Sequence, residues 1–381
     1  MRILHTSDWH IGRTLHKVSM LDAQRAALSQ IAGIAAQERV DLIVVSGDVF
    51  DHAVPSADAL EILEDVLSRM LPVAPVVITA GNHDSLRRLG YGSRLFTQRL
   101  HVRTRVDAAG EAIVFGDVRV YPIPYLHPET ARADLAAEGD DLAATHEAVM
   151  ERVMDRVRTD LAAHPGSRSV VMAHAWVAGG ATSDSERDVS IGGLGTIPTA
   201  VFAGVDYVAL GHLHGPQEPR GVGSTRLRYS GSPLRYSFSE AGHDKSVTVV
   251  DLDDSGVAGI HAVPIAQPRD MAVLRGLMDE LLDPALHQDS VDAWVSAVVT
   301  DDRRPSQMWQ RLQDRYPHLL QVRHEPEGGL TAEKPAAVGR EQKPLEVAAD
   351  FVEYVTNGPI GAAESAAFDQ AVQVVRGKEH A

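Results

Sequence analysis

The chain contains no cysteine, which excludes disulfide bonds and thiolate metal sites and is compatible with a reducing compartment. It also lacks long apolar segments: runs such as Leu42–Val45 and Val76–Ile78 are far shorter than the ~20 residues that span a bilayer. The first motif begins at Ser7, which leaves no room for a signal peptide before it. We therefore expect a cytoplasmic protein without a membrane anchor.

Basic residues are also fewer than acidic ones. The sequence has 36 basic and 52 acidic residues, a formal net charge of −16, and only five of the basic residues are lysine. A protein that holds nucleic acid by bulk charge needs clustered Lys and Arg, so the composition argues against that mode of binding. Local charge at a site still decides what binds there, and divalent cations would offset acidic ligands.

The length of 381 residues, 44% of them hydrophobic, predicts a sizeable core and more than one domain. We expect an α/β domain over residues 1–267 and a small α/β unit over residues 268–326. A segment rich in Pro, Gly, Lys and Glu predicts a linker over residues 327–344. Residues 345–381 are expected to form a helix-loop-helix.

Short apolar runs alternate with helix-like stretches in the first domain. Strands are expected at Arg2–Thr6, Asp41–Ser46 and Pro75–Ala80, with helices at Met20–Glu38 and Ser56–Leu71 between them. Such alternation indicates βαβ units, and open parallel sheets place their sites at the carboxyl ends of the strands.

The pattern continues after a hairpin-like stretch at Ile113–Tyr125. A helix and two strands are expected at Leu142–Ala163, Ser169–His174 and Asp206–Gly211. Three more strands should form an antiparallel tail: Arg226–Ser230, Lys245–Asp251 and Val257–Ile265. The small unit should alternate helix, strand, helix and strand over Met271–Leu282, Asp292–Thr300, Ser306–Tyr316 and Leu319–His324. Two amphipathic helices are expected at Leu345–Val355 and Ala362–Arg376.

Five short motifs combine acidic, amide and imidazole side chains, and each follows an expected strand. They are SDWH (Ser7–His10), GDVFD (Gly47–Asp51), GNHD (Gly81–Asp84), AHAW (Ala173–Trp176) and GHLH (Gly211–His214). An ordered set of this kind is hard to explain by the fold alone. We expect its side chains to bind two metal ions through Asp8, His10, Asp48, Asn82, His174, His212 and His214.

The residue types in these motifs suit metal-assisted hydrolysis of a phosphate ester. Asp8 and His10 are two positions apart on an extended segment and point to the same side, while the carboxylate of Asp48 has two oxygens that can bridge two ions. A mixed oxygen and nitrogen shell suits Mn²⁺, Fe²⁺ or Mg²⁺ better than structural zinc. Two ions about 3.5–4 Å apart can activate a water and bind both oxygens of an in-line displacement.

His83 lies next to a candidate ligand and is expected to protonate the departing alkoxide. Its ring must be oriented, and either Asp51 or Asp84 can accept the other N–H. We favour Asp51, because a residue three positions beyond Asp48 can fold back over the site.

The ordered set resembles the calcineurin-like metallophosphoesterase superfamily over about residues 1–265. The extended motifs SDWHIGRTL (Ser7–Leu15), GNHDS (Gly81–Ser85) and YSGSP (Tyr229–Pro233), together with GDVFD and GHLH, are similar to those of the SbcD family of bacterial double-strand-break repair nucleases. The resemblance implies an α/β fold: a β-sandwich flanked by helices, then a small α/β capping domain and C-terminal helices.

The resemblance also implies how the metals are shared. One ion would be bound by Asp8, His10, Asp48 and His214, and the other by Asp48, Asn82, His174 and His212, with His83 catalytic. The family's activity is Mn²⁺-dependent, exonucleolytic on duplex DNA ends and endonucleolytic on single strands and hairpins. Its members act in DNA repair and recombination as homodimers, with an SbcC-type ATPase bound by the C-terminal helices.

Other interpretations use the same residues. A small-molecule phosphodiesterase or nucleotidase would need the same metal ligands, because metals treat any phosphodiester alike. A metal-stabilised scaffold that docks a partner would have no need of His83. A homodimer is expected through helices around Ser56–Leu71 and Leu86–Leu100, where Leu60, Leu63 and Leu67 share one face.

Overall fold

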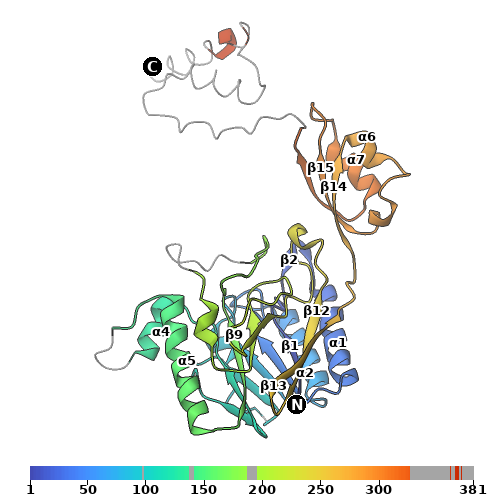
Figure 1. The fold of residues 1–381 in the computed structure, drawn as a ribbon. Helices are drawn as coiled ribbons and strands as arrows, with labels where there is room; N and C mark the ends of the chain where they lie inside the picture. Colours follow the sequence, from blue (N-terminus) through green and yellow to red (C-terminus); the bar gives the residue numbers. More distant parts are fainter. Residues whose placement is uncertain are drawn as a thin grey trace.

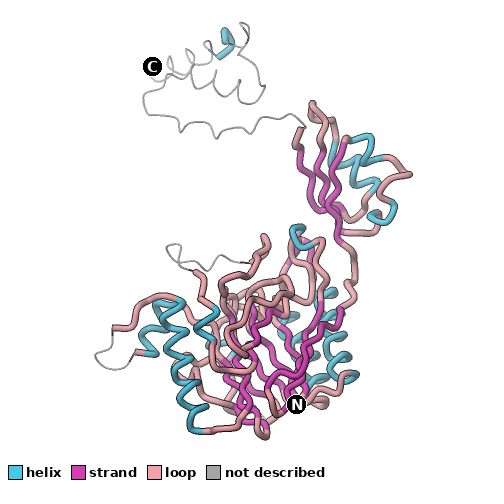
Figure 2. The backbone as a smooth tube through the Cα atoms, viewed as in Figure 1, coloured by secondary structure: helices cyan, strands magenta, loops and turns pink. Residues whose placement is uncertain are grey.

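The computed structural model describes residues 1–96, 98–136, 141–186, 195–326, 361, 365–368 and 370. The main body consists of two β-sheets packed face to face, with helices on the two outer faces (Figures 1 and 2). This confirms the expected α/β sandwich flanked by helices. Among the described helices, none is both long and apolar enough to cross a bilayer.

The first sheet has the strand order β13-β12-β1-β4-β5-β6. Strands β1, β4, β5 and β6 are parallel, whereas β12 is antiparallel to both β1 and β13. Side chains alternate between two cores: Ile3 packs between the sheets, and its neighbour Leu4 packs under the outer helices. The bounds are β1 (Arg2–Thr6), β4 (Leu42–Ser46), β5 (Val76–Thr79), β6 (Leu100–Arg103), β12 (Ser246–Asp253) and β13 (Gly256–Pro264).

The second sheet has the strand order β11-β10-β9-β8-β7. Its bounds are β7 (Ile113–Phe115), β8 (Val118–Pro122), β9 (Arg168–His174), β10 (Tyr207–Gly211) and β11 (Arg226–Tyr229). Strand β11 pairs parallel with β10. The predicted three-stranded antiparallel tail is therefore wrong for its first strand, which belongs to the second sheet, and right for β12 and β13 in the first.

Two helices cover each sheet. The first sheet is covered by α1 (Leu21–Gln37) and α2 (Ala57–Met70), and the second by α4 (Pro128–Leu135) and α5 (His146–Ala163). Smaller elements connect these layers: β2 (Thr14–Leu15), β3 (Val18–Ser19), α3 (Leu86–Leu89), η1 (Thr199–Phe202) and η2 (Phe238–Glu240).

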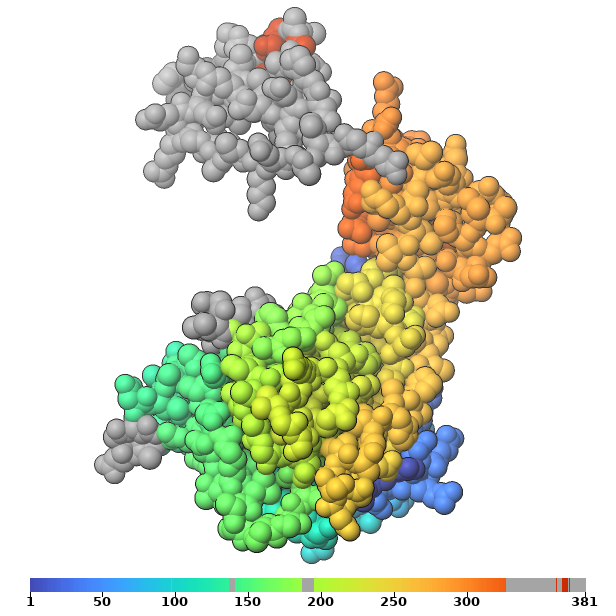
Figure 3. Space-filling view, viewed as in Figure 1, coloured from blue at the N-terminus to red at the C-terminus, as the bar shows by residue number. Residues whose placement is uncertain are grey.

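A smaller unit follows the main body and forms a lobe of its own, coloured orange in Figure 3. Three parallel strands, β14-β15-β16, carry two helices and one 3₁₀ turn. Met271 and Trp294 of this unit pack against the core beneath α1 and α2. Its elements are β14 (Met271–Gly276), α6 (Met278–Leu282), η3 (Gln288–Ser290), β15 (Trp294–Val299), α7 (Met308–Arg315) and β16 (Leu319–His324).

Two predicted helices differ from the structure. The segment Met271–Leu282 begins as strand β14, and its helix starts only at Met278. Among the described residues of the segment Leu86–Leu100, only Leu86–Leu89 are helical; Gly90 is the C-cap of this helix, and turns follow. The predicted helix Leu345–Val355 lies outside the described residues, as does most of Ala362–Arg376, where residues 365–368 and 370 are helical.

Candidate metal centre

The five motifs all follow the carboxyl ends of parallel strands. Strands β1, β4 and β5 in one sheet and β9 and β10 in the other lead directly into them. The sheets are tied together at this edge, where Ser46 Oγ donates to the carbonyl of Ala209 at 2.9 Å. The packing of the two sheets therefore brings together residues that are up to about two hundred positions apart in the chain.

The backbone at the candidate ligands is strained. Asp8, His10, Asp48 and His212 all have positive φ, at 54°, 45°, 49° and 107°. Non-glycine residues rarely adopt this conformation, which costs free energy and persists where the surrounding structure over-determines it. Its concentration at four of the seven predicted ligands points to a functional requirement for these side-chain directions.

Glycines next to the ligands allow the backbone segments to approach closely. A Cβ atom on Gly211 would lie 1.9 Å from the carbonyl oxygen of Ser46, and one on Gly81 would lie 2.1 Å from Asp48 Oδ1. No larger residue fits either position without moving the backbone or the carboxylate of Asp48. The glycines of GHLH and GNHD are thus needed for the assembly of the site.

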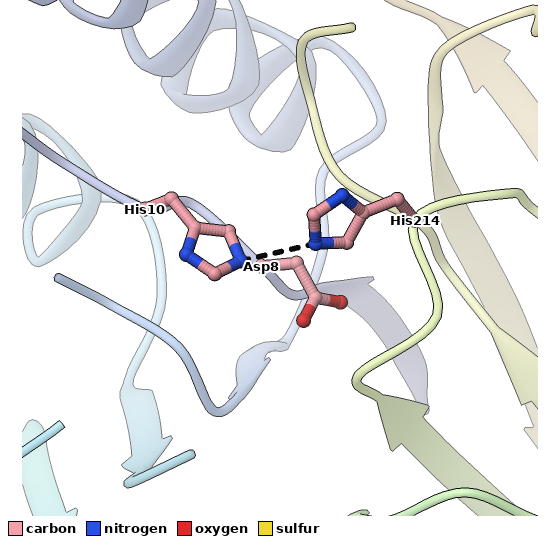
Figure 4. Close-up of side chains that lie close together, drawn as sticks. All are labelled: Asp8, His10 and His214. Carbon is pink, nitrogen blue, oxygen red and sulfur yellow. Dashed lines mark hydrogen bonds between the residues drawn. The ribbon is translucent and has the colours of Figure 1, made fainter. Parts of the chain in front are cut away.

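A first group of donor atoms gathers around His10 and His214. Their Nε2 atoms lie 3.0 Å apart, and Figure 4 shows the two rings directed at one another beside Asp8. One ligand atom each from Asp8, His10 and His214 lies within 4.8 Å of the others. Asp48 Oδ2 is 3.6 Å from His10 Nε2. All four side chains are buried.

A second group shares Asp48 with the first. Asn82 Oδ1 lies 2.9 Å from His174 Nε2 and 3.2 Å from His212 Nδ1. Asp48 Oδ2 is 3.3 Å from His174 Nε2. The structure thus brings all seven predicted ligands together, with the carboxylate of Asp48 between the two groups.

Three of these histidines present Nε2 to the cluster, and two of them, His174 and His214, are held from behind by a hydrogen bond at Nδ1. His174 Nδ1 lies 3.0 Å from the carbonyl of Ser46, and His214 Nδ1 lies 2.6 Å from Ser185 Oγ. His10 Nδ1 lies 3.3 Å from Asp51 Oδ1, but the two atoms form no hydrogen bond. Hydrogen bonds at Nδ1 fix the tautomer and orientation of a metal-binding imidazole.

His83 is buried beside Asp48, and its Nε2 lies 3.9 Å from Asp48 Oδ2. Its Nδ1 is 2.8 Å from the main-chain carbonyl of Asp51, which accepts the ring N–H, and the Asp51 carboxylate lies farther away, with Oδ1 3.6 Å from Nδ1. The carboxylate of Asp84 instead accepts backbone N–H groups of Val49, Phe50 and Gly81. The structure thus places Asp51, the expected partner, beside His83: its carbonyl lies at hydrogen-bond distance, and its carboxylate lies between His10, Arg13 and His83.

Burial and mutual charge set the pKa values within the site. Burial, together with the charge of Asp48, raises the pKa of Asp8 to about 6. Burial by itself lowers the pKa of His174, but the charges of Asp48 and Asp8 outweigh it and raise the pKa to about 9. Carboxylates this close to one another, with imidazole nitrogens directed at them, form an environment that a bound cation would stabilise.

The donor set fits divalent cations. Adjacent ligands of an octahedral ion with bonds of about 2.1 Å lie about 3 Å apart. The separations of 3.0 Å between His10 Nε2 and His214 Nε2, and of 2.9 Å between Asn82 Oδ1 and His174 Nε2, match this spacing. Oxygen and nitrogen donors without sulfur suit Mn²⁺, Fe²⁺ or Mg²⁺. The clustered residues thus indicate a two-metal site.

Residues behind the ligands were missed by sequence reasoning. Arg13 lies within the extended first motif, so its position in SDWHIGRTL was an available signal. Ser185, Glu240 and Lys245 lie outside every motif, and only the fold brings them to His214.

Comparison with known proteins gives two family matches. The calcineurin-like phosphoesterase family matches residues 1–216. The type 5 capsule protein repressor C-terminal domain, the C-terminal family of SbcD, matches residues 267–356. Together they confirm the resemblance to the SbcD family that the motifs indicated.

Similar solved structures are more distant. The protein TT1561 of Thermus thermophilus is 14% identical with a TM-score of 0.41, and the match covers 70% of this chain and 99% of that one. A dimetal phosphatase from Danio rerio is 12% identical with a TM-score of 0.42, over 70% of this chain and 99% of that one. The assignment depends on the family matches. Since the first of them covers more than half of the 381 residues, the chain belongs to the calcineurin-like phosphoesterase family.

Proposed function

We propose that this chain is a two-metal-dependent DNA nuclease of the SbcD type that acts in DNA repair and recombination. The observation that carries the proposal is the meeting of seven metal-ligand side chains beside His83, in a phosphoesterase that also has an SbcD C-terminal domain. Its expected reactions are exonucleolytic cleavage of duplex ends and endonucleolytic cleavage of single strands and hairpins.

The two donor groups would hold one ion each and share Asp48. The first ion would be held by Asp8, His10, Asp48 and His214, and the second by Asp48, Asn82, His174 and His212. When bound, divalent cations supply Lewis acidity and lower the pKa of the attacking water. Mn²⁺ is the proposed metal, with Mg²⁺ or Fe²⁺ as alternatives.

His83 would act as the general acid. Its protonated ring donates Nδ1–H to the carbonyl of Asp51, which leaves Nε2–H on the side of Asp48. As the bond between phosphorus and the leaving oxygen breaks, the Nε2 proton passes to that oxygen, and the imidazole becomes neutral. The backbone N–H of His83 donates to Asp48 Oδ1 at 2.8 Å, which ties the acid to the metal centre.

A second copy of the chain is the proposed partner at the start of α2 and the turns after α3. Large apolar side chains are exposed there: Leu60 is 51% accessible, Tyr91 86% and Leu95 88%. Leu60 and Tyr91 also line a cavity of about 420 Å³ beside Phe50 and Val54. Exposed apolar surface of this kind is typical of protein interfaces. The SbcD-type C-terminal domain supports an SbcC-type ATPase as a further partner.

The substrate class is tested by offering wild-type protein two phosphodiesters in Mn²⁺: a hairpin DNA and a small bis-aryl phosphate. Efficient cleavage of the hairpin supports the nuclease. Turnover of the small ester alone, also after addition of the ATPase partner, would favour a small-molecule phosphodiesterase on the same fold.

A further inference from the structure

A fully buried ion pair lies behind His214. The side chains of Lys245 and Glu240 contact each other, and neither exposes any side-chain surface. Removing two charges from water carries a desolvation penalty that the pairing energy often fails to recover. The ion pair therefore need not stabilise the fold, and its contacts indicate another role.

Hydrogen bonds join this ion pair to the backbone of His214 and, through Ser185, to its ring. Lys245 Nζ donates to Glu240 Oε2, to the carbonyl of His214 at 2.9 Å and to Ser232 Oγ at 2.8 Å. The other carboxylate oxygen, Glu240 Oε1, receives a short hydrogen bond from Ser185 Oγ. Ser185 Oγ in turn lies 2.6 Å from His214 Nδ1. Ser185 thus stands between the imidazole and the buried carboxylate.

The shortest contact of the Ser185 hydroxyl sets the direction of its proton. Ser183 Oγ also lies 3.0 Å from Ser185 Oγ, but its own proton goes to Glu186 Oε2. The carboxylate of Glu240, ionised by its contact with Lys245, can only accept, so the hydroxyl proton of Ser185 must go to Glu240. The hydroxyl oxygen is then an acceptor toward His214, whose Nδ1 must carry a proton. A direct contact of 3.4 Å between His214 Nδ1 and Glu240 Oε1 requires the same direction.

We propose that Ser185, backed by Glu240 and Lys245, is a positioning residue that fixes His214 with its proton on Nδ1. The lone pair of Nε2 then faces the metal centre, 3.0 Å from His10 Nε2. This inference rests on the proposed two-metal function. It adds three residues outside the motifs that prepare one ligand of the first ion before the ion arrives.

The backbone around Ser185 is fixed as well. Arg13 donates to the carbonyl of Ser185 at 2.7 Å, and the backbone N–H of His214 donates to Glu186 Oε1 at 2.7 Å. These contacts hold the segment in place, so removal of the hydroxyl alone should leave its position unchanged.

The test is Mn²⁺ titration of the full-length protein by calorimetry, with wild type, Ser185→Ala and Ser185→Thr. The matched control is Ser169→Ala, which removes another buried hydroxyl bonded to a carboxylate, Asp206 Oδ2 at 2.8 Å, at the opposite end of β9. Wild type should bind two ions. Ser185→Ala should weaken one of the two sites about 10- to 100-fold, which is typical for loss of a contact behind a metal ligand. Ser185→Thr, which keeps the hydroxyl, should restore the affinity.

The outcomes separate the inference from the proposed function. If Ser185→Ala binds both ions like wild type, or loses no more affinity than Ser169→Ala, the positioning role is refuted while the two-metal function stands. If wild type itself fails to bind two ions, the proposed function fails and takes the inference with it. The melting temperatures of metal-free Ser185→Ala and Ser169→Ala should fall by similar amounts. A larger loss of metal affinity in Ser185→Ala would then reflect the positioning of His214 and not a general loss of stability.

Discussion

The histidines of the metal centre differ in the ring nitrogen that faces the cluster. His10, His174 and His214 present Nε2, whereas His212 has Nδ1 3.2 Å from Asn82 Oδ1. For His174 and His214 the choice follows from the group bonded to Nδ1, a carbonyl and a hydroxyl, whereas His10 has the Asp51 carboxylate beside Nδ1 without a hydrogen bond. The motifs predicted which residues would meet, because strand ends converge, but these contacts depend on long-range packing that no local pattern encodes.

Asp51 is the residue for which the geometry changes the expected effect of a mutation. If Asp51 only oriented His83, as the sequence predicts, Asp51→Asn would cut turnover and leave metal content intact. Because the carbonyl of Asp51 holds His83, and its carboxylate lies closer to His10 Nδ1, at 3.3 Å, than to His83 Nδ1, at 3.6 Å, we predict weaker binding of one ion, by about 10- to 100-fold. Metal titration and turnover at saturating Mn²⁺ check this. A large loss of turnover at full metal occupancy would contradict this and show that the Asp51 side chain orients His83.

His5 gives a prediction for stability against pH. It is buried between the sheets, with Nδ1 2.9 Å from the hydroxyl of Tyr207 and Nε2 3.1 Å from the carbonyl of Leu210. Burial, with a smaller effect of Arg228, lowers the pKa of His5 to about 3. The unfolded chain therefore takes up a proton that the folded chain refuses as the pH falls below about 6.5.

Stability should consequently fall by about 2 kcal/mol between pH 7.5 and pH 5 through His5 alone. Urea unfolding at both pH values checks this, with His5→Gln expected to lose that part of the pH dependence. The exposed His127, changed to Gln, is the control and should keep the wild-type dependence. Equal pH dependence in wild type and His5→Gln would show that His5 is not held neutral by burial.

At the level of elements, the parallel strands that end in a motif were predictable because apolar runs stop abruptly at a polar cluster. Strand β14 was not, because Met271, Leu274 and Met278 have helical spacing although the first two belong to the strand. Pairing with β15 over Met271–Gly276 decides its conformation, and such pairing is a long-range interaction.

The leucines on one face of α2 look alike in the sequence but have two different environments in the structure. Leu63 and Leu67 pack against the core, whereas Leu60 is half exposed next to Tyr91 and the turn that carries Leu95. The proposed dimer therefore depends on Leu60 and on the turns after α3, and the remainder of the predicted α2 face is used within the fold.

We predict that Leu60→Glu combined with Leu95→Glu converts a dimer to a monomer at micromolar concentration, because the charges would have to be buried in the interface. Sedimentation velocity checks this. Val114→Glu is the matched control, since Val114 is 53% exposed on β7 in the other sheet. A wild-type protein that sediments only as a monomer, or a double variant that stays dimeric, would contradict the proposed interface.

On the scale of the whole molecule, a chain of net charge −16 is proposed to cleave a polyanion. The acidic ligands are gathered at the edge where the sheets meet, and two divalent cations would contribute four positive charges there. The substrate would thus be attracted to the loaded metal centre while the rest of the surface contributes little. A partner that supplies basic surface would complement this arrangement.

The central claim is metal-dependent DNA cleavage with His83 as the acid, and it is tested most directly by hairpin cleavage in Mn²⁺ with wild type and His83→Ala at equal, measured metal occupancy. We predict cleavage by wild type and a 10²- to 10⁴-fold lower rate for the variant, about the usual contribution of a general acid. Equal rates at equal occupancy would contradict the role of His83, and absence of cleavage by wild type with its ATPase partner present would contradict the nuclease itself.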